Sequence, residues 1–257
     1  MLDAHLHAHH DPHADYPPHG TYFNCAIEPE EISVMGDLVQ RLPGLINFGG
    51  LHPVQYSKKS EVLGTSESLF KTSLSLTDNL VKEIRNKTIC GIGEIGLDRR
   101  PAFAKTLPEQ MVVFEKQLII AQDYHLPVAI HCVRSIGHCI KVLEKIKPKT
   151  PLLLHGWTGH QETAKSLLRF PVFFGLGLGS QWTREKFLGM VKRLPRDRIL
   201  LETDWPYTNV SSQLPYSQVL ELIYQIAAQH LEIDKEELVS IILSNGKVFT
   251  DCPAHRE

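Results

Sequence analysis

The hydrophobic and polar positions of this chain follow two patterns in turn, one typical of strands and one typical of helices. Short runs of apolar and β-branched residues recur along it, and stretches with apolar residues at helical spacing separate them. The runs are almost wholly apolar, as expected for strands of a parallel sheet that is covered on both faces. They predict strands at Leu2–His5, Tyr22–Ile27, Leu45–Gly50, Ile89–Ile95, Pro127–His131, Leu152–His155, Val172–Leu176 and Ile199–Thr203.

The intervening stretches predict helices. The clearest runs over Glu109–Tyr124, where apolar residues recur at helical spacing before a proline begins the next strand. Another is expected from about Gln213 to His230, and Asp234 with Glu237 has the spacing of a capping box at the beginning of the last helix.

Eight strands that alternate with helices predict a (β/α)8 TIM barrel, and a doubly wound α/β sheet is the main alternative. The length of 257 residues fits one barrel. No linker, repeat or low-complexity tract divides the chain. We therefore expect residues 1–257 to form a single domain.

Composition limits the class of protein. With 42% hydrophobic and 22% charged residues the chain has the balance of a soluble globular protein. It contains no apolar run long enough to cross a membrane, and its first residues lack the basic and apolar regions of a signal peptide. We expect a cytoplasmic protein without an obligate protein partner. The formal net charge of -2 leaves a nucleic-acid partner open.

The chain has 14 histidines, and several crowd its beginning. His5 and His7 are two residues apart in or beside a predicted strand, so their imidazoles point to the same side and can bind one metal ion. The others of this segment have a plainer explanation, a solvated histidine-rich loop that binds metal without a function. These are His9, His10, His13 and His19.

Further residues of metal-binding type stand at or near the carboxyl ends of the predicted strands. In a barrel these ends converge on one rim, the face where such enzymes carry out their chemistry. Taken singly, each could be a hydrogen-bonded rim residue or a helix cap. Together they predict a metal site at the C-terminal rim, with His5, His7, Glu94, His131, His155 and Asp204 as ligands.

Six protein ligands are too many for one catalytic metal ion that must keep an open position. They suit two divalent ions, typically ~3.5–4 Å apart, that share a carboxylate and activate a water molecule. Imidazole with carboxylate suits Zn, Mn, Fe or Co, and the oxygen ligands also admit Mg. We expect Glu94 to be the shared ligand and Asp204 to be a ligand that also orients the water and transfers its proton.

The motifs around these residues resemble those of the TatD family of metal-dependent hydrolases, in the amidohydrolase superfamily. The resemblance runs in order from residue 3 to about residue 249. It rests on Asp3-Ala4-His5-Leu6-His7, Gly50-Leu51-His52-Pro53, Gly93-Glu94-Ile95-Gly96-Leu97-Asp98, Pro127-Val128-Ala129-Ile130-His131-Cys132, Leu154-His155-Gly156 and Leu201-Glu202-Thr203-Asp204-Trp205-Pro206.

This resemblance implies a TIM barrel with a dinuclear site at its C-terminal rim. It assigns one metal to His5, His7, Glu94 and Asp204, and the other to Glu94, His131 and His155. Family members are mostly deoxyribonucleases, and relatives remove acyl groups from charged tRNA. The implied substrate is DNA, single-stranded or at its 3′ ends.

The chain departs from the family pattern beside the ligands. Val133 separates Cys132 from Arg134 where the family has an arginine directly, Trp157 follows Gly156 where Cys-Phe is usual, and Trp205 replaces a small serine. None of these positions is a metal ligand. They lie where substrate would be held, so they bear on the substrate and not on hydrolysis.

Basic and aromatic residues near the strand ends are candidates to meet phosphates and bases. The alternative is that the charges are solvated surface groups and the tryptophans belong to the core. His52 is expected to contact substrate or support a ligand. The predicted substrate-binding residues are His52, Arg99, Arg134, Trp157 and Trp205, and Arg100, Lys141, Trp182 and Arg184 are further candidates.

Three functions are therefore considered. The first is a metal-dependent deoxyribonuclease, and the second is an amide or ester hydrolase, such as a deacylase, on the same dinuclear site. The third is a non-catalytic metal-binding protein, which predicts a missing ligand, whereas the six ligand positions are all filled.

Overall fold

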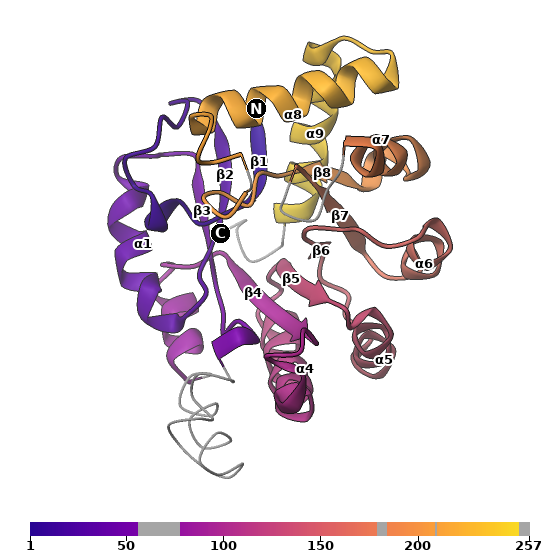
Figure 1. Cartoon of the computed structure of the whole chain (residues 1–257). Helices are drawn as coiled ribbons and strands as arrows, with labels where there is room; N and C mark the ends of the chain where they lie inside the picture. Colours follow the sequence, from indigo (N-terminus) through magenta and orange to yellow (C-terminus); the bar gives the residue numbers. More distant parts are fainter. Residues whose placement is uncertain (56–77, 179–183, 209, 252–257) are drawn as a thin grey trace.

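The computed structural model describes residues 1–55, 78–178, 184–208 and 210–251. Its eight strands are all parallel and follow one another around the sheet in the order of the chain (Figure 1). They are β1 (Leu2–Leu6), β2 (Thr21–Cys25), β3 (Leu45–Gly49), β4 (Gly91–Asp98), β5 (Val128–Val133), β6 (Leu152–Leu154), β7 (Val172–Leu176) and β8 (Ile199–Leu201).

The sheet closes on itself where β1 meets the segment that follows β8. The backbone N–H of Asp204 donates to the carbonyl of His5 at 2.9 Å, and that of His7 donates to the carbonyl of Trp205 at 2.7 Å. A strand order without reversal and this closing contact distinguish a barrel from a doubly wound sheet. The predicted (β/α)8 barrel is confirmed.

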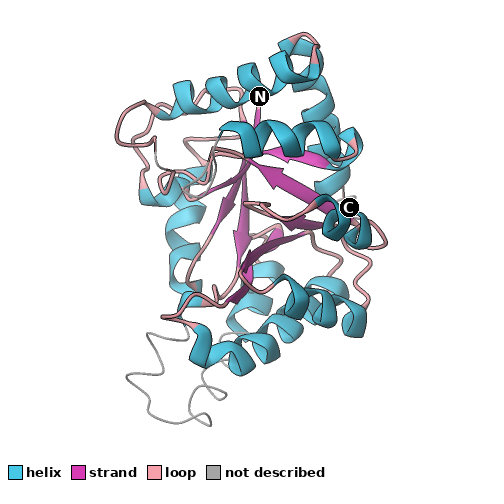
Figure 2. Ribbon diagram, turned by 45° about the vertical axis from the view of Figure 1, so that its right-hand side comes forward, coloured by secondary structure: helices cyan, strands magenta, loops and turns pink. Residues whose placement is uncertain are grey.

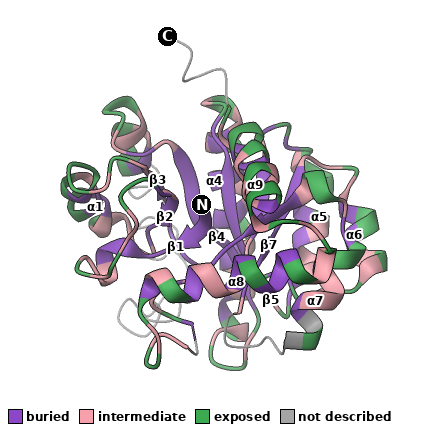
Figure 3. Cartoon of the chain, turned by 90° about the horizontal axis from the view of Figure 1, so that it is seen from above, coloured by how far each residue is buried: buried purple, intermediate pink, exposed green. Residues whose placement is uncertain are grey.

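The helices lie outside the strands (Figure 2), and their sides toward the sheet are mostly buried while their outer sides are exposed (Figure 3). Within the described residues no helix is both long and apolar enough to span a membrane. The α-helices are α1 (Ile32–Val39), α4 (Leu107–Asp123), α5 (Ile136–Ile146), α6 (Gln161–Leu167), α7 (Arg184–Arg193), α8 (Tyr216–Leu231) and α9 (Lys235–Thr250), and the short 3-10 helices are η1 (Ala8–His10), η2 (Pro29–Glu31), η3 (Ala104–Thr106) and η4 (Arg196–Arg198).

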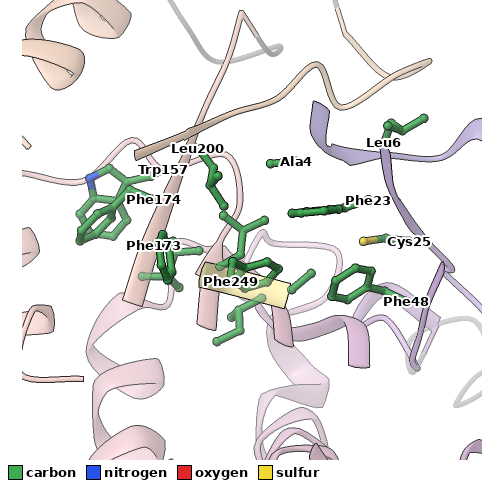
Figure 4. Close-up of a cluster of buried hydrophobic side chains, with 14 of the residues drawn as sticks. Ala4, Leu6, Phe23, Cys25, Phe48, Trp157, Phe173, Phe174, Leu200 and Phe249 are labelled. Atoms are coloured by element: carbon green, nitrogen blue, oxygen red, sulfur yellow. The ribbon is translucent and has the colours of Figure 1, made fainter. Parts of the chain in front are cut away.

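Helix α9 covers the N-terminal end of the barrel, opposite the rim. Its Asn245 side chain donates to the carbonyl of Ile199, at the beginning of β8, at 2.8 Å. Its Phe249 packs against Phe23 of β2, Phe48 of β3 and Phe173 of β7, with ring centroids 5.4–6.0 Å apart (Figure 4). The interior is thus filled by aromatic side chains at this end, and polar groups gather at the other.

Strands β1, β4 and β5 extend further than expected, to Leu6, Asp98 and Val133. Gly96, Leu97 and Asp98 continue the pairing of β4 with β5 beyond Glu94, after a shift of register between Ile92 and Ile95. The strand predicted from the apolar pattern stopped at Ile95, before Gly96, and so missed this extension. Glu94 therefore lies within β4 and not near its end.

The predicted capping box of the last helix is wrong. Asp234 is the N-cap residue of α9, but among the described residues its side chain makes no capping hydrogen bond. Asp234 contributes to the beginning of α9 through its backbone, because its carbonyl accepts the N–H of Leu238 at 3.0 Å.

Candidate metal centre

His5 and His7 stand at the carboxyl end of β1 with both rings directed to the middle of the rim. The His7 Nδ1–H donates to the carbonyl of Cys25 at 2.7 Å, which leaves the lone pair of Nε2 for the centre. His5 is fully buried, and neither of its ring nitrogens has a hydrogen-bond partner within the described chain. A buried imidazole without partners is costly unless a metal ion binds it.

Glu94 lies in the middle of these groups with 4% of its side chain exposed. Its Oε2 is 3.3 Å from Nε2 of His5 and 3.5 Å from Nε2 of His7. Its Oε1 is 2.7 Å from Nδ1 of His131 and 2.8 Å from Nε2 of His155. Each oxygen of this carboxylate thus faces its own group of imidazoles.

Asp204 joins the side of Oε2. It follows β8 in a left-handed conformation, with φ of 57°, and its Oδ1 lies 3.8 Å from Nε2 of His5 and 3.7 Å from Nε2 of His7. Its side chain is 29% exposed, whereas that of His5 is fully buried. Asp204 is therefore the carboxylate of this group that meets solvent and incoming substrate.

His52 follows β3 and lies on the side of Oε1. Its Nδ1 accepts the N–H of Val54 at 3.1 Å, and its Nε2 is 3.3 Å from Oε1 of Glu94. Its ring meets that of His131 edge-on, with centroids 4.4 Å apart. The sequence interpretation left His52 outside the ligand set, but it is as near to Glu94 as His5 is.

Two carboxylates that sequence reasoning missed lie behind the rings on this side. Asp98 accepts from Nε2 of His131 at 3.2 Å and is itself held by Nε of Arg100 at 2.8 Å. Glu202 lies 3.6 Å from Nδ1 of His155, and its Oε1 accepts the N–H of Gly156 at 2.5 Å. Both residues belong to the same short motifs as ligand candidates, which is the only signal that could have indicated them.

The electrostatics of the centre suit a divalent cation. Burial alone would raise the pKa of Glu94, but His155, His52 and His5 hold it well below its usual range. Burial would lower the pKa of His155, but Glu94 and Glu202 raise it well above the ordinary value. Burial lowers the pKa of His5 and so keeps this ring neutral. Once the protonated rings release their protons, imidazoles around ionised carboxylates are the donor set that zinc and similar metals prefer.

A family model described as TatD related DNase matches residues 2–250 of this chain. The chain belongs to the TatD family. The metal-ligand candidates all lie within the matched region.

Among its curated TatD relatives are a deoxyribonuclease Tat-D of Schizosaccharomyces pombe and the human deoxyribonuclease TATDN3. The first is 26% identical over 204 residues, which are 72% of this chain and 62% of the relative. The second is 28% identical over 207 residues, 78% of this chain and 72% of the relative. The human 3′-5′ RNA nuclease TATDN2 is 29% identical over 136 residues, 50% of this chain and only 18% of that protein. The chain thus spans less than two thirds of the length of several relatives.

Solved TatD-family structures share the fold over nearly the whole chain. The TatD homologue YJJV of Escherichia coli superposes with a TM-score of 0.72 at 22% identity and covers 98% of both chains. A TatD-family hydrolase of Entamoeba histolytica gives the same TM-score at 17% identity, with 97% of both chains covered.

Above the centre of this TatD-family chain lies a cavity of about 640 Å³. The predicted substrate residues His52, Arg134 and Trp157 line it, and so do Arg100 and Tyr207. Arg134 is exposed, whereas Trp157 is 5% exposed and packs against Phe174. The wall thus offers cationic and aromatic groups close to the proposed ligands.

The remaining predicted substrate residues lie elsewhere. Arg99 is exposed and outside the cavity wall formed by the described residues, where its neighbour Arg100 takes part. Trp205 is 5% exposed, donates from its indole N–H to Asp11 at 3.0 Å and packs against Tyr216. Lys141 is exposed on α5 away from this wall, Trp182 lies outside the described residues, and the side chain of Arg184 is not described.

Proposed function

We propose that this TatD-family chain is a divalent-metal-dependent nuclease that hydrolyses phosphodiester bonds at its rim. The observation that carries the proposal is the position of Glu94, whose two oxygens face two separate groups of imidazoles. The deoxyribonuclease names of the relatives from Schizosaccharomyces pombe and human support the class of bond.

Two ions fit these two groups. His5, His7 and Asp204 would hold one with Oε2 of Glu94, and His131 and His155 would hold the other with Oε1. Zinc, manganese and magnesium are the candidate metals, since the set mixes imidazole with carboxylate. When bound, such ions polarise a phosphoryl oxygen and lower the pKa of water.

The carboxylate of Asp204 is suited to accept a proton from the attacking water and to return it to the leaving oxygen. Burial would raise the pKa of Asp204, but a hydrogen bond from His7 and the nearby His155 and His5 lower it. The group is therefore ionised before reaction and can take up a proton. Asp98 and Glu202 would keep the rings of His131 and His155 in register during turnover.

The cavity wall favours a single strand of nucleic acid. Arg134 and Arg100 would meet backbone phosphates, because guanidinium groups bind phosphate oxygens in pairs. Trp157 is too deeply buried to stack on a base, but Tyr207 in the same wall is 51% exposed and offers an aromatic surface to one. His52 would contact the phosphate nearest the centre. A 3′ end in single-stranded DNA is the substrate that this arrangement suits.

The test is hydrolysis of single-stranded DNA labelled at its 5′ end, with the protein loaded in turn with Mg²⁺, Mn²⁺ and Zn²⁺. We expect progressive shortening from the 3′ end, and none after chelation. The same preparations are offered a panel of carboxylate esters, amides and lactones. DNA that stays intact with every metal, while an ester or amide is hydrolysed, would replace the nuclease by a deacylase.

A further inference from the structure

A second group of metal-binding side chains lies beside the rim centre. The 3-10 helix η1 carries His9 and His10, and both rings are directed to Glu31 at the end of η2. Nε2 of His9 is 3.1 Å from Oε2 of Glu31, and Nε2 of His10 is 3.0 Å from Oε1. The three ligand atoms lie within 4.8 Å of one another, close enough to share one ion.

The carboxylate of Glu31 is fixed in place and charged. Its Oε2 accepts the backbone N–H groups of Ile27 at 2.6 Å and Glu28 at 3.2 Å. Burial would raise the pKa of Glu31, but hydrogen bonds from His10, His9 and the backbone lower it well below its usual range. An ionised carboxylate with fixed orientation is a ready metal ligand.

His9 is oriented by a buried asparagine. The side chain of His9 is 2% exposed, and its Nδ1 lies 3.1 Å from Oδ1 of Asn24. The neighbours of Asn24 fix the orientation of its side-chain amide. Its Oδ1 accepts the N–H of Ala8 at 2.8 Å, and its Nδ2 donates to Oδ1 of Asn47 at 2.9 Å. Nδ1 of His9 must therefore carry the hydrogen and donate.

This bond leaves the other nitrogen of the His9 ring mismatched. With its hydrogen on Nδ1, a neutral ring presents the lone pair of Nε2 to Glu31, which is itself an acceptor. These two atoms, 3.1 Å apart at a buried ring, repel each other unless Nε2 carries a second proton or a metal ion lies between them. A histidine that binds zinc usually donates its other ring N–H to an acceptor, and Asn24 provides such an acceptor to His9.

We propose that His9, His10 and Glu31 form a separate site for a divalent ion of the zinc class. Two imidazoles and one carboxylate are a zinc-type donor set, which leaves a fourth position for water. The side chains of His10 and Glu31 are 22% and 24% exposed, so an ion can enter from solvent.

The site is adjacent to the rim centre but shares none of its proposed ligands. The ring of His10 stacks on that of His7 with centroids 5.5 Å apart, and its Nδ1 lies 2.8 Å from the hydroxyl of Tyr207 in the cavity wall. An ion bound to His10 therefore also fixes the position of Tyr207. Through His10 and Tyr207, an ion in the second site therefore affects the wall of the substrate cavity.

The direct test is a crystal of the wild-type protein grown with a small excess of Zn²⁺ and measured at the zinc absorption edge. We expect an anomalous peak about 2.0–2.1 Å from Nε2 of both His9 and His10. A filled rim centre with no peak between these rings would overturn the proposal and leave a histidine–glutamate ion pair.

A pair of variants tests the site in solution. His10→Ala removes one ligand and keeps the buried ring of His9, and His13→Ala removes an exposed histidine of the same segment. Competition with a chromophoric chelator should show one zinc equivalent fewer in His10→Ala than in His13→Ala or wild type. Crystals of His10→Ala should keep the peaks beside Glu94. Equal zinc equivalents in both variants, or loss of a rim ion instead, would contradict the proposal.

Discussion

At the scale of single residues, the centre depends on the groups that lie behind three of its imidazoles. The carbonyl of Cys25 fixes His7, Asp98 fixes His131, and Glu202 lies behind His155. Such outer contacts select the tautomer that presents a lone pair to a metal, and their loss typically lowers metal affinity about 10- to 100-fold. The same logic applies to Asn24 behind His9 in the second site.

Replacing Asp204 by Asn keeps its shape and removes its capacity to accept a proton. We expect kcat to fall by roughly 10²–10⁴-fold, the usual contribution of a general base, while the free energy of unfolding stays near that of wild type. Asp197→Asn, at a carboxylate whose side chain is 74% exposed, is the matched control and should be silent. A near-normal kcat in Asp204→Asn would refute the proton-transfer role.

Metal affinity should increase with pH. The pKa of His155 is well above its ordinary value in the metal-free protein, and the pKa values of His131 and His7 are also raised, each because neighbouring carboxylates outweigh burial. The protonated rings must release their protons before a metal ion binds. Competition titrations should therefore give tighter binding at pH 8 than at pH 6, with protons released on binding. Equal affinity at both pH values would show that these rings are already neutral.

At the scale of elements, the sequence predicted where strands begin better than where they end. Apolar runs locate β1 to β8 because both faces of these strands are buried. The strand ends were predicted less accurately. Strand β4, for example, continues through Asp98 because its backbone pairs with β5, and the apolar pattern does not indicate this pairing. The cluster of ligand candidates followed from strand ends that share a rim. The contacts of Asp98 and Glu202 did not follow, because they depend on distances between segments far apart in the chain.

Glycines of β7 and the segment after it make room for Glu202. A Cβ on Gly175 would lie 2.0 Å from Oε2 of Glu202 and 3.1 Å from Cα of His155. Gly175→Ala should therefore displace Glu202, lower metal affinity, and reduce the free energy of unfolding by about 1–3 kcal/mol.

The control for this change is Gly189→Ala in α7, where an added Cβ meets nothing within 4 Å. It should leave metal affinity unchanged and stabilise the helix by up to about 1 kcal/mol. Denaturant unfolding of both variants gives the free energy of unfolding, and metal titration gives the metal affinity. Wild-type metal affinity in Gly175→Ala would show that Glu202 does not position His155.

At the scale of the whole molecule, the barrel brings together residues that are up to 199 positions apart, from His5 to Asp204. The proposed ligands come from β1, β4 and β5 and from the segments after β1, β6 and β8, so the centre forms only when the ring closes. Helix α9 fills the opposite end with Phe249 and leaves the rim open. We infer that the chain unfolds as a single domain, with its metal centre as part of the fold.

Metal loading should accordingly stabilise the whole chain. An ion that binds only the folded state adds about 2.7 kcal/mol at a free concentration of 100 times Kd. We expect Tm to rise on loading and to fall again on chelation, as measured by calorimetry. Glu94→Gln should show a much smaller shift, and an equal shift in this variant would place the stabilising ions elsewhere.

The central claim is that Glu94 joins two metal groups in one hydrolytic centre. Its most direct test compares the hydrolysis of 5′-labelled single-stranded DNA by wild type and by Glu94→Gln, each chelated and then reloaded with Mn²⁺. We predict hydrolysis by reloaded wild type and none above the metal-free background by Glu94→Gln, although both remain folded by circular dichroism. Hydrolysis by Glu94→Gln at the wild-type rate would contradict the account.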